Sequence, residues 1–240
     1  MSVASTIRRS LNVLPGFKVV PDTEALWWKG PPRFSLGGHD YRCFCHSHNC
    51  GWPTSRMTER AIEMAIADRW LGTGDGTKTI EIGAVTPYYW PGRVGTVVDP
   101  VDEHPKVTHP QSVFDVDLRG YDVLSISTLE HIGLGDYLPP VANETCEGAF
   151  EKIRRESRRF LVTVPFGLNP AADEFFFSDE MTDVRYMVRD PFNNWWIEVR
   201  CAREARRPYG KDGYAINGWA NGLAILHRDV PASAAPTSDE

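Results

Sequence analysis

The segment Lys78-Thr-Ile-Glu-Ile-Gly83 is a short run of mostly β-branched residues that contains an acid and ends in a glycine. Two similar runs follow it, Gly95-Thr-Val-Val-Asp99 and Tyr121-Asp-Val-Leu-Ser-Ile-Ser127. Short apolar runs with flanking glycine are typical of buried strands in a parallel sheet, and ligands of such sheets bind beyond the carboxyl ends of the strands. At these ends the chain carries potentially reactive side chains: Glu81, Asp99, Glu130 and His131. The pattern therefore predicts an α/β fold with a nucleotide-type site.

Length and charge limit the classes of protein to which the chain can belong. It has 240 residues, of which 42% are hydrophobic, enough for the core of one α/β domain with elaborations. The formal net charge of −6 argues against a broad phosphate-binding surface. No apolar run approaches the ~20 residues of a membrane span, and no secretory signal is visible. With an odd set of five cysteines, these features predict a cytoplasmic protein with reduced thiols and no membrane partner.

Periodicity and composition divide the chain into three parts. Residues 1–57 are interrupted by prolines and predict an N-terminal arm packed on the domain. Residues 58–230 form the predicted domain, and residues 231–240 are small and polar, which predicts a disordered tail. Within the domain, Thr58–Leu71 and Val141–Arg158 show the apolar spacing of amphipathic helices.

The remaining strands are predicted from short apolar runs. Phe160–Pro165 continues the parallel set, and Ser112–Val116 is a weaker candidate. Beyond Pro165 three candidate strands follow with no clear helix between them: Val184–Arg189, Trp195–Cys201 and Gly218–Leu226. Because consecutive strands without crossover helices pair in an antiparallel manner, we expect an antiparallel edge there.

Three motifs stand in a recognisable order: Glu59-Arg60 before the first strand, Ser125–His131 at a later strand end, and Val164-Pro-Phe-Gly-Leu-Asn169 after that. This order resembles the class I, Rossmann-like S-adenosylmethionine-dependent methyltransferases, and more narrowly a divergent bacterial group of methyltransferase-like proteins with a degenerate glycine motif. The resemblance covers roughly residues 58–169. It implies a doubly wound, mostly parallel sheet with S-adenosyl-L-methionine as the cofactor.

The resemblance also implies roles for individual residues. Glu81 and Gly83 match the first cofactor motif, in which a turn without side chains lets the backbone approach the cofactor. Asp99 matches the acid that binds the ribose hydroxyls, and Asp115 would lie near the adenine. The end of the later strand would line the methyl-transfer site with four residues: Ser127, Leu129, Glu130 and His131.

One departure from the family pattern concerns the turn after the first strand. The family places further glycines two and four residues after the first, where this chain has Val85 and Pro87. A valine side chain crowds a ligand lying against the turn, and proline removes a backbone donor. Either the cofactor lies differently in this chain, or its binding is weak or lost.

His131 and Glu130 are the predicted catalytic residues. An imidazole titrates near neutrality and can accept the proton of a sugar or phenolic hydroxyl as the methyl group arrives. In some related O-methyltransferases a Glu-His pair instead helps to bind a divalent cation. A third reading is a histidine that is merely hydrogen-bonded inside the turn.

A dense group of thiols and imidazoles lies in the N-terminal part: Cys43, Cys45, His46, His48 and Cys50. Such side chains suit zinc, but the spacing differs from that of a zinc ribbon or finger. Plain packing is the leading interpretation, a role for His46 or His48 near the cofactor is an alternative, and no metal site is predicted.

The sequence thus favours an enzyme that methylates an oxygen of a small-molecule or glycan acceptor. The alternative is a fold relative that has lost the cofactor and serves as a binding or scaffold protein, which Val85 and Pro87 favour. Modification of nucleic acid ranks third, because the net charge is negative and the Asn/Asp-Pro-Pro-Tyr-like signature is missing. We also allow for a homodimer.

Overall fold

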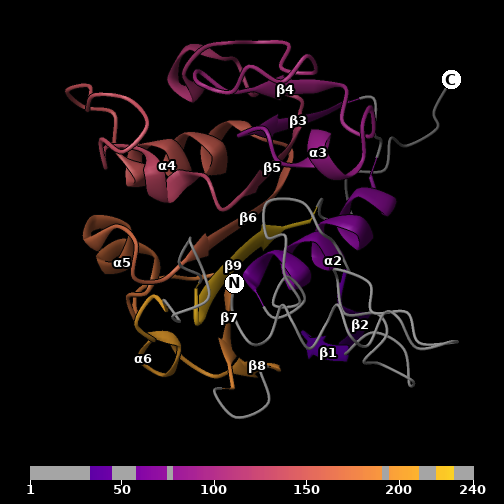
Figure 1. The fold of residues 1–240 in the computed structure, drawn as a ribbon, viewed down its shortest axis with the longest axis vertical. Helices are drawn as coiled ribbons and strands as arrows, with labels where there is room; N and C mark the ends of the chain where they lie inside the picture. The colour runs from indigo at the N-terminus through magenta and orange to yellow at the C-terminus, as the bar shows by residue number, and fades with distance from the viewer. Residues whose placement is uncertain (1–32, 45–57, 75–77, 191–194, 211–219, 230–240) are drawn as a thin grey trace, which may run out of the picture.

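The computed structural model describes residues 33–44, 58–74, 78–190, 195–210 and 220–229. Its centre is a seven-stranded sheet with the order β4-β3-β5-β6-β9-β7-β8, and Figure 1 shows this sheet crossing the molecule. The strands are β3 (Thr79–Ile82), β4 (Thr96–Val98), β5 (Asp122–Ile126), β6 (Arg159–Pro165), β7 (Val184–Arg189), β8 (Trp196–Val199) and β9 (Gly222–Arg228). β3, β4, β5 and β6 are parallel, whereas β9 pairs antiparallel with β6 and with β7, and β8 pairs antiparallel with β7.

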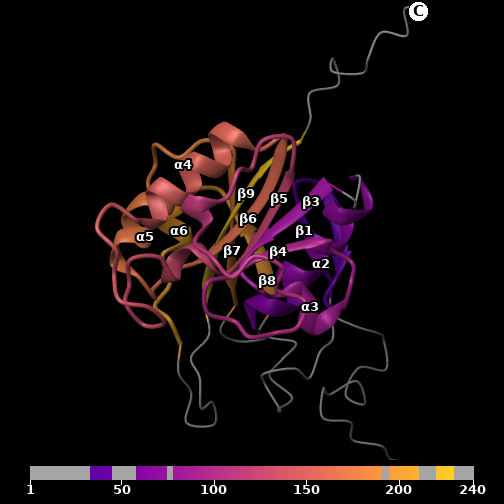
Figure 2. The same cartoon turned by 90° about the horizontal axis from the view of Figure 1, so that it is seen from above.

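Helices cover both faces of the sheet (Figure 2). On one side lie α2 (Glu59–Gly72) and α3 (Thr86–Tyr89), and on the other lie α4 (Cys146–Glu156), α5 (Pro170–Phe176) and α6 (Ala202–Ala205). Two 3-10 helices, η4 (Val113–Asp115) and η5 (Leu129–His131), belong to the connections before and after β5. Every residue of β3, β5 and β6 is buried, as expected for parallel strands covered on both faces.

The sequence predicted this architecture in outline. The α/β class and the antiparallel edge are confirmed, and the two predicted helices correspond to α2 and α4. The prediction of a strand at Ser112–Val116 was wrong, because this segment contains the 3-10 helix η4. There the Ser112 hydroxyl accepts a hydrogen bond from the backbone of Phe114, and Val113 and Val116 turn into the core. Local side-chain capping competes with strand formation for serine.

Helix α5 was not predicted from sequence, although the chain carries a signal for it. The Asn169 side chain accepts a hydrogen bond from the Ala171 amide, and Pro170 occupies the first turn. An asparagine cap followed by proline is a recognised helix start. The helix is short, so it has no long periodic pattern.

The described part of the predicted N-terminal arm is a hairpin of β1 (Arg33–Leu36) and β2 (His39–Arg42). Phe34 and Leu36 are buried in the same core cluster as α2, and the Gly37 amide donates to Glu198 on β8 at 2.9 Å. The remaining arm residues and the predicted tail at 231–240 lie outside the described residues. Within the part that the structure describes, no helix combines the length and apolar character needed to cross a membrane.

Candidate functional site

The parallel strands end at one edge of the sheet, here called the carboxyl edge. β3 lies between β4 and β5, so the chain moves outward in one direction from β3 to β4 and in the other from β5 to β6. The crevice between β3 and β5 is therefore a topological switch point, where open α/β sheets bind ligands. Gly83 follows β3 and Ser127 follows β5, which places both predicted residues beside this crevice.

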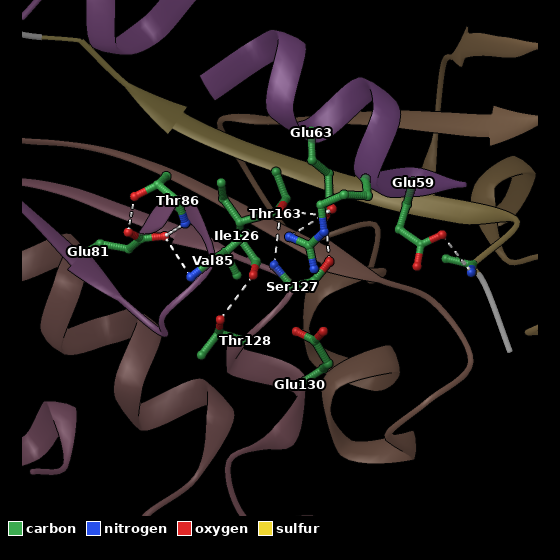
Figure 3. Close-up of polar contacts among 12 residues, drawn as sticks. Glu59, Glu63, Glu81, Val85, Thr86, Ile126, Ser127, Thr128, Glu130 and Thr163 are labelled. Atoms are coloured by element: carbon green, nitrogen blue, oxygen red, sulfur yellow. Dashed lines mark hydrogen bonds and ion pairs between the residues drawn. The ribbon is translucent and has the colours of Figure 1, made fainter. Parts of the chain in front are cut away.

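Helix α2 brings further charged residues to the same edge, as Figure 3 shows. Glu63, on the first half of α2, accepts a hydrogen bond from the Ser127 hydroxyl at 2.5 Å and another from the Thr163 hydroxyl at 2.7 Å. Ser127 adopts a left-handed backbone conformation with φ of 42°. The carboxyl ends of β5 and β6 are thereby joined to the helix through one carboxylate oxygen, Glu63 Oε1.

Three buried polar atoms at this edge have no hydrogen-bond partner among the described residues: Arg60 Nη1, Glu63 Oε2 and Glu130 Oε2. Arg60 Nη1 and Glu63 Oε2 are 3.6 Å apart, close enough to attract but beyond a normal hydrogen bond. Burial raises the pKa of Glu130 well above its ordinary value, and the negative charge of Glu63 adds to this effect. Burial also raises the pKa of Glu59 to about 7, again with a contribution from Glu63.

His131 is held by an acid that the sequence did not single out. Its Nδ1 atom lies 2.6 Å from Asp136 Oδ2, and its Nε2 atom lies 3.7 Å from Glu130 Oε1. Because a carboxylate can only accept, the proton of the neutral ring resides on Nδ1 and leaves Nε2 free to accept one. The ring also packs edge-on against Tyr137, with centroids 4.7 Å apart. Asp136 follows in an irregular loop, so no spacing rule pointed to it.

Glu81 has local partners that hold the turn after β3. Its carboxylate accepts hydrogen bonds from the Val85 amide at 3.1 Å and the Thr86 amide at 2.7 Å, and from the Thr86 hydroxyl. Burial raises the pKa of Glu81 to about 7 in spite of these donors. Glu81 thus shapes the turn, and its direct contact with a cofactor remains a prediction.

Glycine is required at position 83 because the Thr128 side chain occupies the space that a Cβ would need. Its φ is +88°, and an added Cβ would lie 2.1 Å from the Thr128 Oγ1 atom. The close approach that favours glycine is therefore the approach of the segment after β5, whereas the sequence interpretation ascribed it to a cofactor. Pro87 is buried, and Val85 packs against the core cluster of α2, so both side chains form part of the packed face.

Asp99 is half-buried and organises the loop after β4. One oxygen accepts from the amides of Val101 and Asp102, both at 2.8 Å, and the other accepts from the Ala84 amide at 3.0 Å. Since each carboxylate oxygen can accept two bonds, the oxygen that faces Ala84 retains one position that no described residue fills. This position is available to a ligand hydroxyl.

Asp99 and the His131 region share one neighbourhood. Burial raises the pKa of Tyr137, and the negative charges of Asp136, Glu130 and Asp99 raise it further. Asp99 follows β4 and Glu130 and His131 follow β5, and both strands belong to the parallel set that ends at the carboxyl edge. The predicted ribose acid and the predicted base therefore face the same region of the carboxyl edge.

Two further predicted residues have different surroundings. Leu129 is fully buried in the core cluster that includes α4, so its side chain packs and lines no open surface. Asp115 is exposed on η4, and η4 packs on α4 through Phe114 and Val113. No hydrogen bond within the described residues connects Asp115 with Asp99 or Glu130.

Two other features lie apart from the site. Cys43 is buried, whereas Cys45, His46, His48 and Cys50 lie outside the described residues; among the residues that are described, no group of three or more potential ligands could hold a metal ion. A cavity of about 440 Å³ opens at the opposite edge of the sheet, between Arg154 of α4 and Arg228 of β9, and shares no lining residue with the site.

The comparisons with known proteins add no further identification. No family model matches the chain, and neither the curated proteins nor the solved structures contain a match.

Proposed function

We propose that the chain is a Rossmann-like, S-adenosylmethionine-dependent methyltransferase that methylates an oxygen of a small-molecule or sugar acceptor. The observation that carries the proposal is the convergence of Asp99, Glu130 and His131 on one region of the carboxyl edge. This region adjoins the switch point between β3 and β5, where the fold physics favours a ligand.

The strand order supports the same conclusion. An antiparallel strand, β9, enters the sheet between β6 and β7, which otherwise run in the same direction. The mostly parallel sheet with an antiparallel edge agrees with the sheet that the resemblance implies. Helices on both faces of the sheet agree with a doubly wound fold.

The residues present suit an aminoacyl nucleoside. Asp99 retains an acceptor position for a ribose hydroxyl, and the unpaired polar atoms beside α2 suit charged groups. When bound, the cofactor supplies a methyl group on a positively charged sulfur that leaves as a neutral thioether. Because Gly83 is covered by Thr128 and Val85 packs inward, the ligand would lie over the end of β5 and the start of α2.

His131 would remove the acceptor proton. Asp136 fixes the ring so that Nε2 is the free nitrogen, and the ring is 24% exposed, which allows a substrate hydroxyl to approach it. As the acceptor oxygen bonds to the methyl carbon, its proton passes to Nε2 and the resulting positive charge is stabilised by Asp136. General base assistance of this kind contributes roughly 10²–10⁴-fold.

The test has two parts. S-Adenosylmethionine at saturating concentration should raise the melting temperature by a few degrees, roughly as expected for micromolar binding. Transfer of a labelled methyl group to a panel of phenolic and sugar alcohols should then be lost, by about 10²-fold or more, in His131→Ala while cofactor binding is retained. Full transfer activity in His131→Ala would show that His131 is not the general base.

A second candidate, a binding or scaffold protein without cofactor, is favoured by a specific observation. Glu81 accepts three hydrogen bonds from the amides and hydroxyl of its own turn, and Pro87 is buried within that turn. The turn that contacts the cofactor in the family is thus closed by its own residues. Failure of both S-adenosylmethionine and S-adenosylhomocysteine to alter the melting temperature would favour this candidate.

A further inference from the structure

The edge of the sheet at which the parallel strands begin, here called the amino edge, contains the cavity of about 440 Å³. This volume lies within the usual range of small-molecule sites, roughly 300–1,000 Å³. The cavity opens where β6 and β7 begin and β9 ends, beside the second half of α4. Because it shares no lining residue with the carboxyl edge, its role is independent of the proposed function.

Apolar side chains form one part of the cavity lining. Phe150 of α4 and Phe160 of β6 are buried and pack edge-on, with ring centroids 5.6 Å apart. Met181, which precedes β7, is half-buried and packs against the same core cluster. Together these three side chains offer the cavity an apolar and largely aromatic surface, which suits a ligand with a flat apolar body.

Arg228 supplies a positive charge held in place at the same cavity. Its Nη1 atom donates to the Arg154 carbonyl and its Nη2 atom to the Ser157 carbonyl, both at 2.7 Å, and Nη2 lies 3.4 Å from the Ser157 hydroxyl. The guanidinium also lies over the Phe160 ring, 5.0 Å from the centroid. None of these partners carries a formal charge, so the end of α4 positions the guanidinium without neutralising it.

The guanidinium of Arg228 retains donors for a ligand. It has five N–H groups, and its three contacts use at most three of them. Among the described residues no carboxylate forms an ion pair with Arg228, whereas Arg154 and Arg155 pair with Glu151 and Glu156 at 2.9 and 2.8 Å. The charge of Arg228 therefore remains for an anionic group in the cavity.

Two acids in the lining limit the charge of the ligand. Glu151 is half-buried and paired, whereas Asp183 is exposed. Both repel a ligand with several negative charges, and Arg228 repels a cation. We propose that the cavity binds a small aromatic monocarboxylate, whose carboxylate accepts hydrogen bonds from Arg228 while its ring packs against Phe150 and Phe160. The planar guanidinium suits this pairing, because its parallel N–H groups match the two oxygens of a carboxylate.

Three probes separate the charge of the ligand from its ring: 2-naphthoate, its neutral analogue 2-naphthamide, and acetate, which lacks the ring. Calorimetric titration of the full chain should give saturable binding of naphthoate, at least about tenfold tighter than that of naphthamide, as expected for charge-assisted hydrogen bonds. Acetate should show no measurable binding, because it buries too little apolar surface. Equal affinity for naphthoate and naphthamide, or no saturable binding of naphthoate, overturns the proposal.

Substitutions show whether the probe occupies this cavity. Arg228→Gln should lower the affinity for naphthoate to that for naphthamide and leave the latter unchanged. Because Arg228 also caps α4, Asp183→Asn provides a second variant that keeps the fold: asparagine tolerates the left-handed backbone of this position, where φ is 58°. Removal of this exposed acid should tighten naphthoate binding by about twofold and leave naphthamide binding unchanged.

Two further variants complete the test. Thr182→Trp places a large ring at an exposed position of the lining and should abolish binding of both aromatic probes, whether or not Arg228→Gln folds. The matched control is Arg119→Gln, which removes an exposed arginine outside the cavity and should change neither affinity. Naphthoate binding that persists unchanged in Thr182→Trp would place the probe elsewhere on the protein and overturn the proposal.

Discussion

The two ends of helix α2 carry arginine clusters that are built in opposite ways. Near the C-terminal end, Arg159 donates to Asp122 at 2.7 Å, to the Thr73 hydroxyl at 3.0 Å and to the Trp70 carbonyl at 3.1 Å. Its guanidinium also lies over the Trp70 ring, 4.1 Å from the centroid. Near the N-terminal end, Arg60 Nη1 has no hydrogen-bond partner among the residues that the structure describes. All three guanidinium nitrogens of Arg159 donate hydrogen bonds, and its cluster is here called complete; the Arg60 cluster, in which Nη1 does not donate to a described residue, is called incomplete.

This difference distinguishes a bonded structural network from a group of charges whose partners are incomplete. Asp122 and Arg159 begin adjacent strands β5 and β6 and face each other in register, so their bonds tie the amino edge of the sheet to α2. A satisfied buried network rigidifies the fold. Arg60, Glu63 and Glu130 lie at the carboxyl edge, where sheets of this architecture bind ligands, and their buried atoms without a hydrogen bond among the described residues lower the stability of the fold.

The largest effect on stability is expected at the complete cluster. Asp122→Asn removes the charge that Arg159 and Arg158 both contact at 2.7 Å, leaving a buried guanidinium uncompensated. We expect a loss of about 3 kcal/mol in the free energy of unfolding, measured by urea denaturation. Asp117→Asn, which removes an exposed acid paired with exposed Arg119, is the matched control and should leave the denaturation midpoint unchanged. Similar midpoints for both variants would abolish the contrast between the clusters.

A smaller, pH-dependent effect is expected at the incomplete cluster. The folded pKa values of Glu130 and Glu59 are raised above the ordinary 4.5, to about 7 for Glu59. The folded state therefore holds protons that the unfolded chain has already released above about pH 4.5. This contribution to stability is complete below that pH and is lost as the pH rises through the folded pKa values.

Glu130→Gln tests this prediction. The variant should be more stable than the wild type by roughly 1–2 kcal/mol at pH 8, because no buried carboxylate without a partner has to ionise, and the difference should shrink toward pH 4.5. Urea denaturation at a series of pH values gives the measurement. A difference that grows as the pH falls would show that Glu130 is ionised and stabilised in the fold.

The smallest effect is expected for Arg60→Met. The Arg60 side chain is 22% exposed and its ion pair with Glu63 is 3.6 Å long, so its removal should change the free energy of unfolding by no more than about 1 kcal/mol. The same substitution at Arg159, which is 5% exposed and fully bonded, serves as the comparison and should cost several times as much. Equal losses in urea denaturation would show that Arg60 is also structural.

The candidate site was partly visible in the sequence because its strand ends have a clear local signature. Asp99, Glu130 and His131 each follow a short apolar run or stand in the turn that follows one, and the parallel sheet brings their surroundings together. Glu63 and Asp136 carried no such signature. Glu63 lies inside a helical pattern where charged residues usually face solvent, and Asp136 lies in an irregular loop.

The roles of individual residues were harder to predict than their positions. The spacing of Glu81 and Gly83 along the sequence fits a cofactor motif. In the structure, however, Glu81 bonds to Thr86 and Gly83 packs against Thr128. Leu129 lies in the right turn and points into the core. A motif records spacing along the chain, whereas partners are decided by which segments pack against it.

The order of strands and helices, the burial of the central strands and the antiparallel edge were determined by the sequence itself, because apolar periodicity and turn residues act over a few positions. Which buried charges are paired was decided by the tertiary structure. Arg159 contacts Asp122 across two strands and Thr73 at the end of a helix, while Arg60 Nη1 has only the 3.6 Å contact with Glu63 among the described residues. Completion of a charge cluster depends on groups that are distant in the chain, and local patterns contain no information about their separation in space.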